Sequence, residues 1–383
     1  MIARFRFYGS LREAKAEWTR FHLPAMVDDE RQLFTKAFAF IEDADPIELA
    51  SLKGDVEDLG GKAYRCDTSI SRMLIVGSRD MFPELSEIAS PVAVTLREAL
   101  SNLLCRENRT IRIGGHDIVL DRTQVMGIVN VTPDSFSDGG LCFGVDKAFD
   151  RALQMAEYGV DMIDVGGEST RPFSDPVSES EELKRVIPVI ERLSDELRVP
   201  ISVDTRRPNV ASRALESGAV MVNDISGLRD PAMISAVANA GVPVVLMHMR
   251  GEPKTMQENI RYDDVVGDIM TILKRNISAA MEAGMDPENI IIDPGIGFGK
   301  TTDNNLEIIR RLYEFRCMDH PIMVGPSRKN FIGKILDLPV AERLEGTLAA
   351  SVASIINGAD MIRVHDVKEA VRAAKMADSF RRF

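Results

Sequence analysis

Four polar side chains in the second part of the chain could hydrogen-bond a flat heterocycle such as a purine or a pterin: Asp204, Asn223, Asp293 and Lys329. Three further side chains could neutralise an anion: Arg171, Arg363 and His365. Asn130 offers an amide oxygen, which is a suitable ligand for a hard metal ion. A cationic side next to an acidic side suits the departure of pyrophosphate from a carbon whose developing positive charge is stabilised by Asp204 or Asp293.

These residues end or follow short apolar runs that are typical of buried strands. The runs are Val125–Val131, Met162–Val165, Ile201–Asp204, Met221–Ile225, Val244–Met247, Ile290–Asp293, Ile322–Val324 and Met361–Val364. Segments of helical period lie between most of them. Buried parallel strands that alternate with helices in this way predict a (β/α)8 barrel, whose active site lies at the carboxyl ends of the strands. An open doubly wound sheet is the alternative, but it seldom needs eight evenly spaced units.

The first 108 residues follow another pattern. The segments that stand out are an alternating stretch at Ala3–Tyr8, an apolar strand at Met73–Val76, and helical stretches at Pro46–Leu59 and Leu96–Leu104. We therefore interpret residues 1–108 as a small α/β domain of unknown role, and residues 109–383 as a catalytic barrel. Thr110–Ile113 and Asp117–Leu120 flank a Gly-Gly-His turn, which predicts a hairpin that closes the bottom of the barrel.

Composition excludes several classes of protein. With 47 Lys+Arg against 59 Asp+Glu, the net charge is −12, and the acidic excess is spread along the chain, which argues against nucleic acid as the main partner. The 4 cysteines stand far apart, as in proteins of a reducing compartment. The N-terminus lacks the apolar region of a signal peptide, and no long apolar stretch suggests a membrane span. We expect a cytoplasmic protein that acts on small molecules.

Residues 294–301 imitate a phosphate-binding P-loop, because Gly299-Lys300-Thr301 ends the segment. The first glycine of that motif is replaced by Pro294, and the segment follows the sixth strand of a barrel. We therefore do not expect ATP to bind there.

Two longer motifs resemble the signatures of dihydropteroate synthases. Residues 126–140 (MGIVNVTPDSFSDGG) resemble the first signature and residues 164–172 (DVGGESTRP) the second. Shorter motifs, from Val203-Asp204-Thr205 to Arg363-Val364-His365-Asp366, follow in the family's order. The resemblance covers about Thr110 to the C-terminus. It implies a transferase that condenses 6-hydroxymethyl-7,8-dihydropterin diphosphate with 4-aminobenzoate in folate biosynthesis, giving 7,8-dihydropteroate and diphosphate.

The resemblance also implies roles for individual residues. The pterin ring would be held by Asp204, Asn223, Asp293 and Lys329, of which Asp204, Asp293 and Lys329 are the expected catalytic residues. The diphosphate would be held by Asn130, Arg363 and His365, with Asn130 as a ligand of Mg²⁺. The aminobenzoate side would be lined by Thr170, Arg171, Pro172, Phe298 and Ser327. The segments Thr132–Phe143 and Ser169–Val177 resemble the family's mobile lids, and the family suggests a homodimer.

One departure from the family concerns Asn330, where many relatives carry Ser at the start of a helix that meets the substrate carboxylate. Asn also caps helices well, so we expect the site to be preserved. Three alternatives remain: a pterin-dependent methyltransferase, the same condensation with a ribosylated aminobenzoate, and a non-catalytic binding protein on the same scaffold. The methyltransferase would not need Asp134, Arg171 or the Ser-Arg-Lys run at 327–329, and the binding protein predicts a damaged rim.

Overall fold

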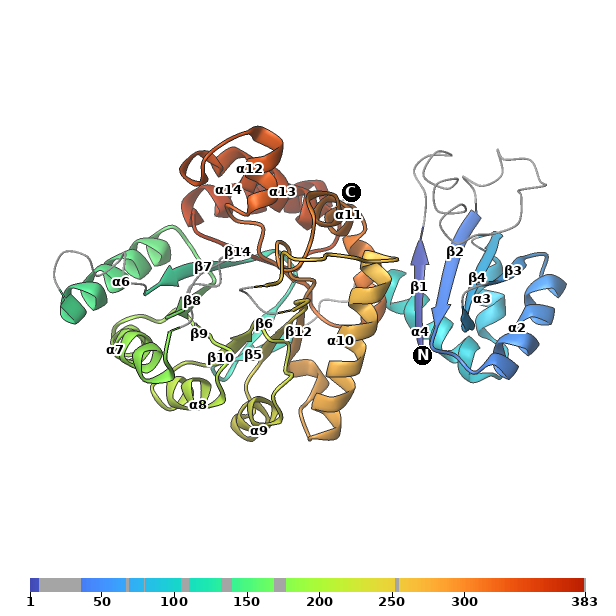
Figure 1. Ribbon diagram of the computed structural model, residues 1–383, viewed down its shortest axis with the longest axis horizontal. Coiled ribbons are helices and arrows are strands. Elements are labelled where there is room, and N and C mark those ends of the chain that lie inside the picture. The colour runs from blue at the N-terminus through green and yellow to red at the C-terminus, as the bar shows by residue number, and fades with distance from the viewer. Residues whose placement is uncertain are drawn as a thin grey trace. The chain divides into compact units, whose positions relative to one another are not determined.

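The computed structural model describes residues 1–6, 36–66, 69–78, 80–104, 110–131, 140–168, 177–251 and 255–381. The chain forms two compact units (Figure 1). The smaller unit consists of Met1–Glu107 and Tyr313–Asp319, and the larger unit of Asn108–Leu312 and His320–Phe383.

Eight parallel strands build the larger unit. They are β7 (Gln124–Asn130), β8 (Met162–Gly166), β9 (Ile201–Asp204), β10 (Met221–Asp224), β11 (Val244–Met247), β12 (Ile290–Asp293), β13 (Met323–Val324) and β14 (Met361–Val364). Their order is β12-β11-β10-β9-β8-β7-β14-β13, and a parallel bridge between Ile292 and Ile322 joins the two ends. The predicted (β/α)8 barrel is confirmed. Because both faces of its strands are covered, they appear in the sequence as continuous apolar runs.

Helices surround the strands as an outer layer (Figure 1). They are α6 (Gly140–Glu157), α7 (Glu179–Glu196), α8 (Pro208–Glu216), α9 (Pro231–Ala240), α10 (Val265–Glu282), α11 (Thr302–Arg310), α12 (Asn330–Leu336), α13 (Leu344–Ile356) and α14 (Val367–Arg381). In α7, Val186, Ile190 and Leu193 repeat at helical spacing and are buried, while Ser178 caps the N-terminus. Within the described ranges, no helix combines the length and apolarity needed to cross a bilayer.

A hairpin closes the amino-terminal end of the barrel, as predicted. Its strands are β5 (Thr110–Ile113) and β6 (His116–Val119). Ile111 and Ile113 are buried in a cluster with the first inward-facing residues of the barrel strands, many of which are methionines: Met126, Met162, Met221, Val245, Ile291, Met323 and Met361. Methionine fills irregular gaps well, which suits the junction of a flat hairpin with a round barrel.

The smaller unit is an α/β sheet structure, as expected. Its strands are β1 (Ile2–Arg6), β2 (Lys36–Glu42), β3 (Lys62–Cys66) and β4 (Ser69–Ser78), in the order β1-β2-β4-β3 with every neighbouring pair antiparallel. Its helices are α2 (Pro46–Asp58), α3 (Met81–Ser86) and α4 (Pro91–Leu104). Asp45 caps α2 and a proline opens it, which explains where that helix begins.

A buried arginine holds a distant part of the chain in this smaller unit. Arg4 is 0% exposed, and its guanidinium bonds Glu42 and Glu314, each at 3.0 Å. It also lies 4.4 Å from the ring centroid of Phe40. Glu314 belongs to η3 (Leu312–Met318), which follows α11 in the chain. The core of the smaller unit therefore includes a segment encoded within the barrel sequence.

Candidate functional site

Polar residues predicted from the sequence converge at the carboxyl ends of the barrel strands. Asn130, Asp204 and Asp293 are the last residues of β7, β9 and β12, while Asn223 lies in β10 and Arg363 in β14. Strand pairing places Asp204 beside Asn223. Both are buried, as is Asp293. Carboxyl ends of parallel strands are where barrel enzymes carry their chemistry.

Arg363 links the acidic groups of this site. Its Nη2 donates to Asp204 Oδ2 at 2.6 Å, and its Nε donates to Asp164 Oδ2, also at 2.6 Å. Asn223 Nδ2 donates to the same oxygen of Asp164 at 2.9 Å. Asp164 was not among the residues predicted from the sequence. An aspartate in the middle of the buried run Met162–Gly166 was the signal that could have revealed it, because a charge in such a position requires partners.

Burial brings three site residues close to titration at neutral pH. Desolvation raises the pKa of Asp204 to about 7, although Arg363 and Lys329 oppose this shift. Desolvation also raises the pKa of Asp293 to about 6, against a stabilising backbone N–H from Gly295. It lowers the pKa of Lys329 to about 8. Opposite shifts in neighbouring acids and bases are typical of functional sites.

An apolar wall borders the polar groups. Phe298 packs in a buried cluster with Ile225, Met247, Met249 and Met256. The ammonium of Lys329 lies 3.9 Å from the ring centroid of Phe298. A flat apolar surface beside convergent donors and acceptors suits a planar aromatic ligand.

Hydrogen bonds fix the loop that carries Phe298. Gly295 has a φ of +71°, and a Cβ there would lie 1.9 Å from the carbonyl oxygen of His248, so only glycine fits. Asp293 Oδ1 accepts the N–H of Gly295 at 2.7 Å. Lys300 is buried behind the loop and donates to the carbonyl of Phe298 at 2.9 Å. Its inward position supports the rejection of a P-loop here.

Ser327 and His365 form a hydrogen-bonded pair. Ser327 Oγ lies 2.9 Å from His365 Nδ1 and accepts the backbone N–H of His365 at 3.2 Å. Burial and the nearby cation of Arg363 lower the pKa of His365 to about 3. The ring is therefore neutral. If the serine hydroxyl donates to Nδ1, the ring proton resides on Nε2, which then becomes a hydrogen-bond donor.

Lys329, rather than Asn330, occupies the N-cap position of α12. Asn330 is the first residue inside the helix, and no side chain caps this end. The expectation that Asn330 would cap the helix is wrong.

Several predicted residues lie outside the described part of the chain: Thr170, Arg171, Pro172 and most of the two predicted lids. Glu168 and Val177, which flank the undescribed residues of the second lid, are hydrogen-bonded to each other. Val177 N–H donates to Glu168 Oε1 at 3.2 Å, and Arg207 donates to Val177 O at 2.5 Å and to both carboxylate oxygens of Glu168. Arg207, which lies in the loop after β9, therefore bonds to both of these residues.

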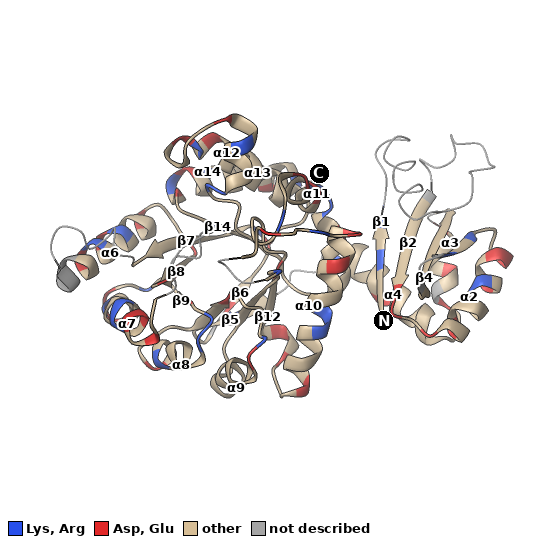
Figure 2. Cartoon of the chain, viewed as in Figure 1, with Lys and Arg blue, Asp and Glu red and all other residues tan. Residues whose placement is uncertain are grey.

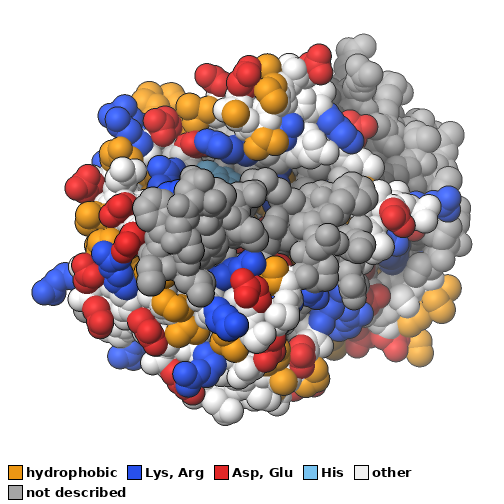
Figure 3. Space-filling view, turned by 60° about the vertical axis from the view of Figure 1, so that its left-hand side comes forward, with side chains coloured by type: hydrophobic (Ala, Val, Ile, Leu, Met, Phe, Trp, Pro, Cys, Tyr) orange, Lys and Arg blue, Asp and Glu red, His pale blue; other side chains and the backbone are white. Residues whose placement is uncertain are grey.

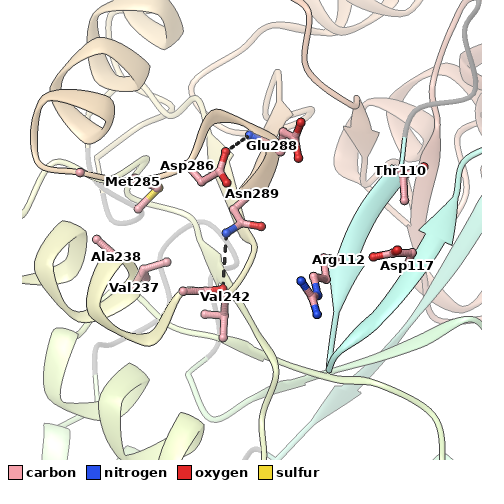
Figure 4. A pocket seen from close by; sticks show the side chains of 12 residues that line it. Thr110, Arg112, Asp117, Val237, Ala238, Val242, Met285, Asp286, Glu288 and Asn289 are labelled. Carbon is pink, nitrogen blue, oxygen red and sulfur yellow. Dashed lines mark hydrogen bonds between the residues drawn. The ribbon is translucent and has the colours of Figure 1, made fainter.

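A cavity of about 680 Å³ lies at the opposite, amino-terminal end of the barrel (Figure 4). Arg112 and Asp117 border it from the hairpin, and Asp286, Glu288 and Asn289 from the turn before β12. None of the convergent polar residues lines it. It is therefore not the candidate active site.

The charged surface agrees with a small-molecule site. Figure 2 shows Lys and Arg interspersed with Asp and Glu along the outer helices. Figure 3 shows a histidine beside Lys and Arg side chains on one face, next to residues that are not described. Mixed surface charge without one extended basic patch in these views argues against nucleic acid as the ligand.

Comparisons with known proteins give a consistent result. A family profile described as "Pterin binding enzyme" matches residues 126–365. A dihydropteroate synthase of Bacillus subtilis is 50% identical over 260 residues, covering 68% of this chain and 89% of the relative. A crystal structure of Xanthomonas albilineans dihydropteroate synthase with 4-aminobenzoic acid is 43% identical, with a TM-score of 0.68, and covers 72% of this chain and 100% of that one.

A third relative reaches further toward the N-terminus. It is a probable bifunctional folylpolyglutamate synthase/dihydropteroate synthase of Haloferax volcanii, 45% identical over 346 residues. The match covers 86% of this chain and 41% of the relative. It therefore extends beyond the barrel into the first 108 residues.

Proposed function

Because this chain belongs to the dihydropteroate synthase family of pterin-binding enzymes, we propose roles for its individual residues in that reaction. The enzyme is a transferase of folate biosynthesis. It condenses 6-hydroxymethyl-7,8-dihydropterin diphosphate with 4-aminobenzoate, giving 7,8-dihydropteroate and diphosphate. The observation that carries the assignment of roles is the convergence of buried Asp204, Asn223 and Asp293 with Lys329 and Arg363 at one end of the barrel.

The pterin is proposed to lie against Phe298, with its polar edge facing the buried acids. Asp204, Asn223 and Asp293 would accept its N–H donors, and Lys329 would donate to a ring acceptor. The carbon–oxygen bond to the diphosphate then breaks, and the ionised carboxylate of Asp204 stabilises the positive charge that develops on the pterin methylene. The neutral aromatic amine attacks this carbon with its lone pair, and the resulting ammonium loses its proton to solvent water. No general base on the enzyme is required.

The diphosphate is proposed to bind Arg363, His365 and Asn130. Neutral His365 would donate from Nε2, and Arg363 would supply the positive charge. Mg²⁺ fits here by donor chemistry: a Cβ at Gly166 would lie 3.5 Å from Asp204 Oδ2 and 3.7 Å from Asn130 Oδ1, so two hard oxygens border one spot. Asn130 would hold the ion together with diphosphate oxygens, and the ion neutralises leaving-group charge when bound.

Asn130→Ala is expected to weaken binding of the diphosphate part of the substrate without weakening binding of the pterin part. Loss of the amide oxygen should weaken Mg²⁺-dependent binding of the pterin diphosphate by about tenfold or more, while affinity for the bare hydroxymethyl pterin stays unchanged. Calorimetry with both ligands measures this. Equal loss for the two ligands would contradict the division of roles.

The amine is proposed to approach from the side of Phe298 and Ser327. Thr170, Arg171 and Pro172 are proposed for the same side, on the strength of the family motif alone. The test is diphosphate release from the pterin diphosphate with either 4-aminobenzoate or its ribosylated form. Turnover with the ribosylated amine alone would overturn the choice of 4-aminobenzoate.

The reaction is expected to have a bell-shaped pH profile. Asp204 and Asp293 must be ionised to accept N–H bonds, so kcat/KM for the pterin diphosphate should fall as pH drops through about 7 to about 6. Lys329 must be protonated to donate, so kcat/KM should also fall as pH rises through about 8. Steady-state rates across this range measure both limbs, and the alkaline limb should disappear in Lys329→Gln. A kcat/KM that does not change with pH would contradict the roles proposed for Asp204, Asp293 and Lys329.

A homodimer is proposed from exposed apolar side chains on neighbouring helices. They are Ile335, Leu336, Val340, Ile356, Met376 and Phe380, on α12 to α14 and the turn after α12. Large apolar groups exposed together usually mark an interface. Analytical ultracentrifugation of the full chain measures the oligomeric state.

A cytoplasmic location is proposed from the wide spacing of the cysteines.

A further inference from the structure

Asp164 lies within the barrel at a position that none of the roles above uses. It is the third residue of β8 and is 0% exposed. One of its oxygens, Oδ2, accepts from Asn223 Nδ2 at 2.9 Å and from Arg363 Nε at 2.6 Å. A single carboxylate oxygen therefore contacts one residue of the proposed pterin side and one of the proposed diphosphate side.

The bond to Asn223 fixes which atom of its amide faces a ligand. The oxygen and nitrogen ends of an amide have nearly the same shape, so hydrogen-bond partners decide its orientation. An ionised carboxylate can only accept, and Asp164 therefore selects the NH₂ end of Asn223. The amide oxygen is left as the acceptor for a ligand. Asn223 is 3% exposed, so solvent does not provide a competing partner.

The bond to Arg363 fixes a second group. Nε is held by Asp164 and Nη2 by Asp204, both at 2.6 Å, so two carboxylates define the plane of the guanidinium. Nη1 takes part in neither bond. A planar guanidinium held in this way directs its remaining N–H groups at an anion.

The other carboxylate oxygen of Asp164 indicates a role beyond stability. Oδ1 is buried and makes no hydrogen bond within the described residues, and the same is true of the hydroxyl of Ser202, which pairs with Asp164 in the strand register. An unsatisfied buried acceptor destabilises the fold. An aspartate needed only for packing would be better replaced by an apolar residue.

We propose that Asp164 is a specificity-determining positioning residue. It turns the amide of Asn223 so that the oxygen accepts an N–H of a flat heterocycle, and it holds Arg363 in place for the anion. This inference rests on the proposed pterin site. The ligand class that it selects is a heterocycle that presents a ring N–H or an exocyclic amine to Asn223.

A double-mutant cycle on the full chain tests this inference. The variants are Asp164→Asn, Asn223→Ala and the combination of both, and the probe is 6-hydroxymethyl-7,8-dihydropterin without its diphosphate, measured by calorimetry. Asp164→Asn lets the amide of Asn223 rotate, and we expect pterin affinity to fall by about ten- to a hundredfold. Because Asp164 acts through Asn223, adding Asp164→Asn to Asn223→Ala should cost less than about threefold more.

Additive losses in the cycle would overturn the inference, because they would mean that Asp164 acts independently of Asn223. If Asn223→Ala itself binds the pterin normally, the proposed pterin site is wrong, which is a different failure. Should Asp164→Asn not fold, Asp164→Ser completes the same cycle with a smaller side chain.

Asp224→Asn is the matched control. Asp224 is also 0% exposed and is the residue after Asn223, but within the described residues its carboxylate accepts hydrogen bonds from Ser226 and Leu228, in the turn that follows β10. We expect this variant to lower the melting temperature without changing pterin affinity. An equal loss of affinity in Asp224→Asn would assign the effect of Asp164 to general destabilisation.

Discussion

Asp293→Asn is expected to lower pterin affinity by about ten- to a hundredfold. In the wild-type enzyme, Oδ1 of Asp293 accepts the N–H of Gly295 at 2.7 Å, which leaves Oδ2 to accept from the ligand. An asparagine would keep its oxygen on Gly295 and turn its NH₂ group toward the pterin donors. Two donors would then face each other in a buried site, a mismatch that costs on the order of 1–3 kcal/mol.

Calorimetry with the hydroxymethyl dihydropterin measures this effect directly. Asp264→Asn serves as a control, because Asp264 is another buried carboxylate of the barrel, but it pairs with Arg311 and belongs to none of the proposed binding sites. The control should bind the pterin with unchanged affinity. Unchanged pterin affinity in folded Asp293→Asn would show that this carboxylate does not accept a hydrogen bond from the pterin ring.

Arg363→Met is expected to affect both activity and stability. It removes the counter-charge of Asp164 and Asp204 and leaves two buried carboxylates close together, a loss of about 3–5 kcal/mol in unfolding free energy. It also removes the proposed cation for the diphosphate, and kcat/KM should fall by about a hundredfold or more.

The stability loss in Arg363→Met should become smaller as the pH falls. The pKa of Asp204 is already raised to about 7, and it rises further when Arg363 is absent. A carboxyl group whose pKa is higher in the folded state destabilises the fold above its unfolded pKa, and the penalty shrinks as pH falls through the folded value. The gap in melting temperature between variant and wild type should therefore be smaller near pH 6 than near pH 8. A gap that is constant with pH would mean that Asp204 gains no proton in this range.

Much of the barrel was predictable because its strands are buried on both faces. The runs Ile201–Asp204 and Ile290–Asp293 coincide with β9 and β12, and each ends on a carboxylate of the proposed site. Helix α9 was not predicted: seven of its ten residues are Ala, Val, Ile or Met, so it lacks the contrast between a polar and an apolar face. Strand β2 was also not singled out, since its central residues are buried on both sides and do not alternate.

The sequence predicted which residues gather at the strand ends, but not how they pair. Ser327 and His365 are 38 residues apart, and their hydrogen bond depends on the adjacency of β13 and β14. The sequence assigned them to opposite sides of the site. Asp164 was missed because a strand pattern does not reveal which barrel partners a single inward charge meets.

The inclusion of Tyr313–Asp319 in the smaller unit has a consequence for biosynthesis. Domains made early usually fold while the ribosome is still working, but this one lacks one of the two carboxylate partners of Arg4 until Glu314 has been translated. That segment leaves the ribosome roughly 200 residues after Glu107, a delay on the order of 10–40 seconds at ~5–20 residues per second. During that interval Arg4 has Glu42 as a partner, but its second carboxylate partner, Glu314, does not yet exist. The first part of the chain to be made is therefore among the last to be completed.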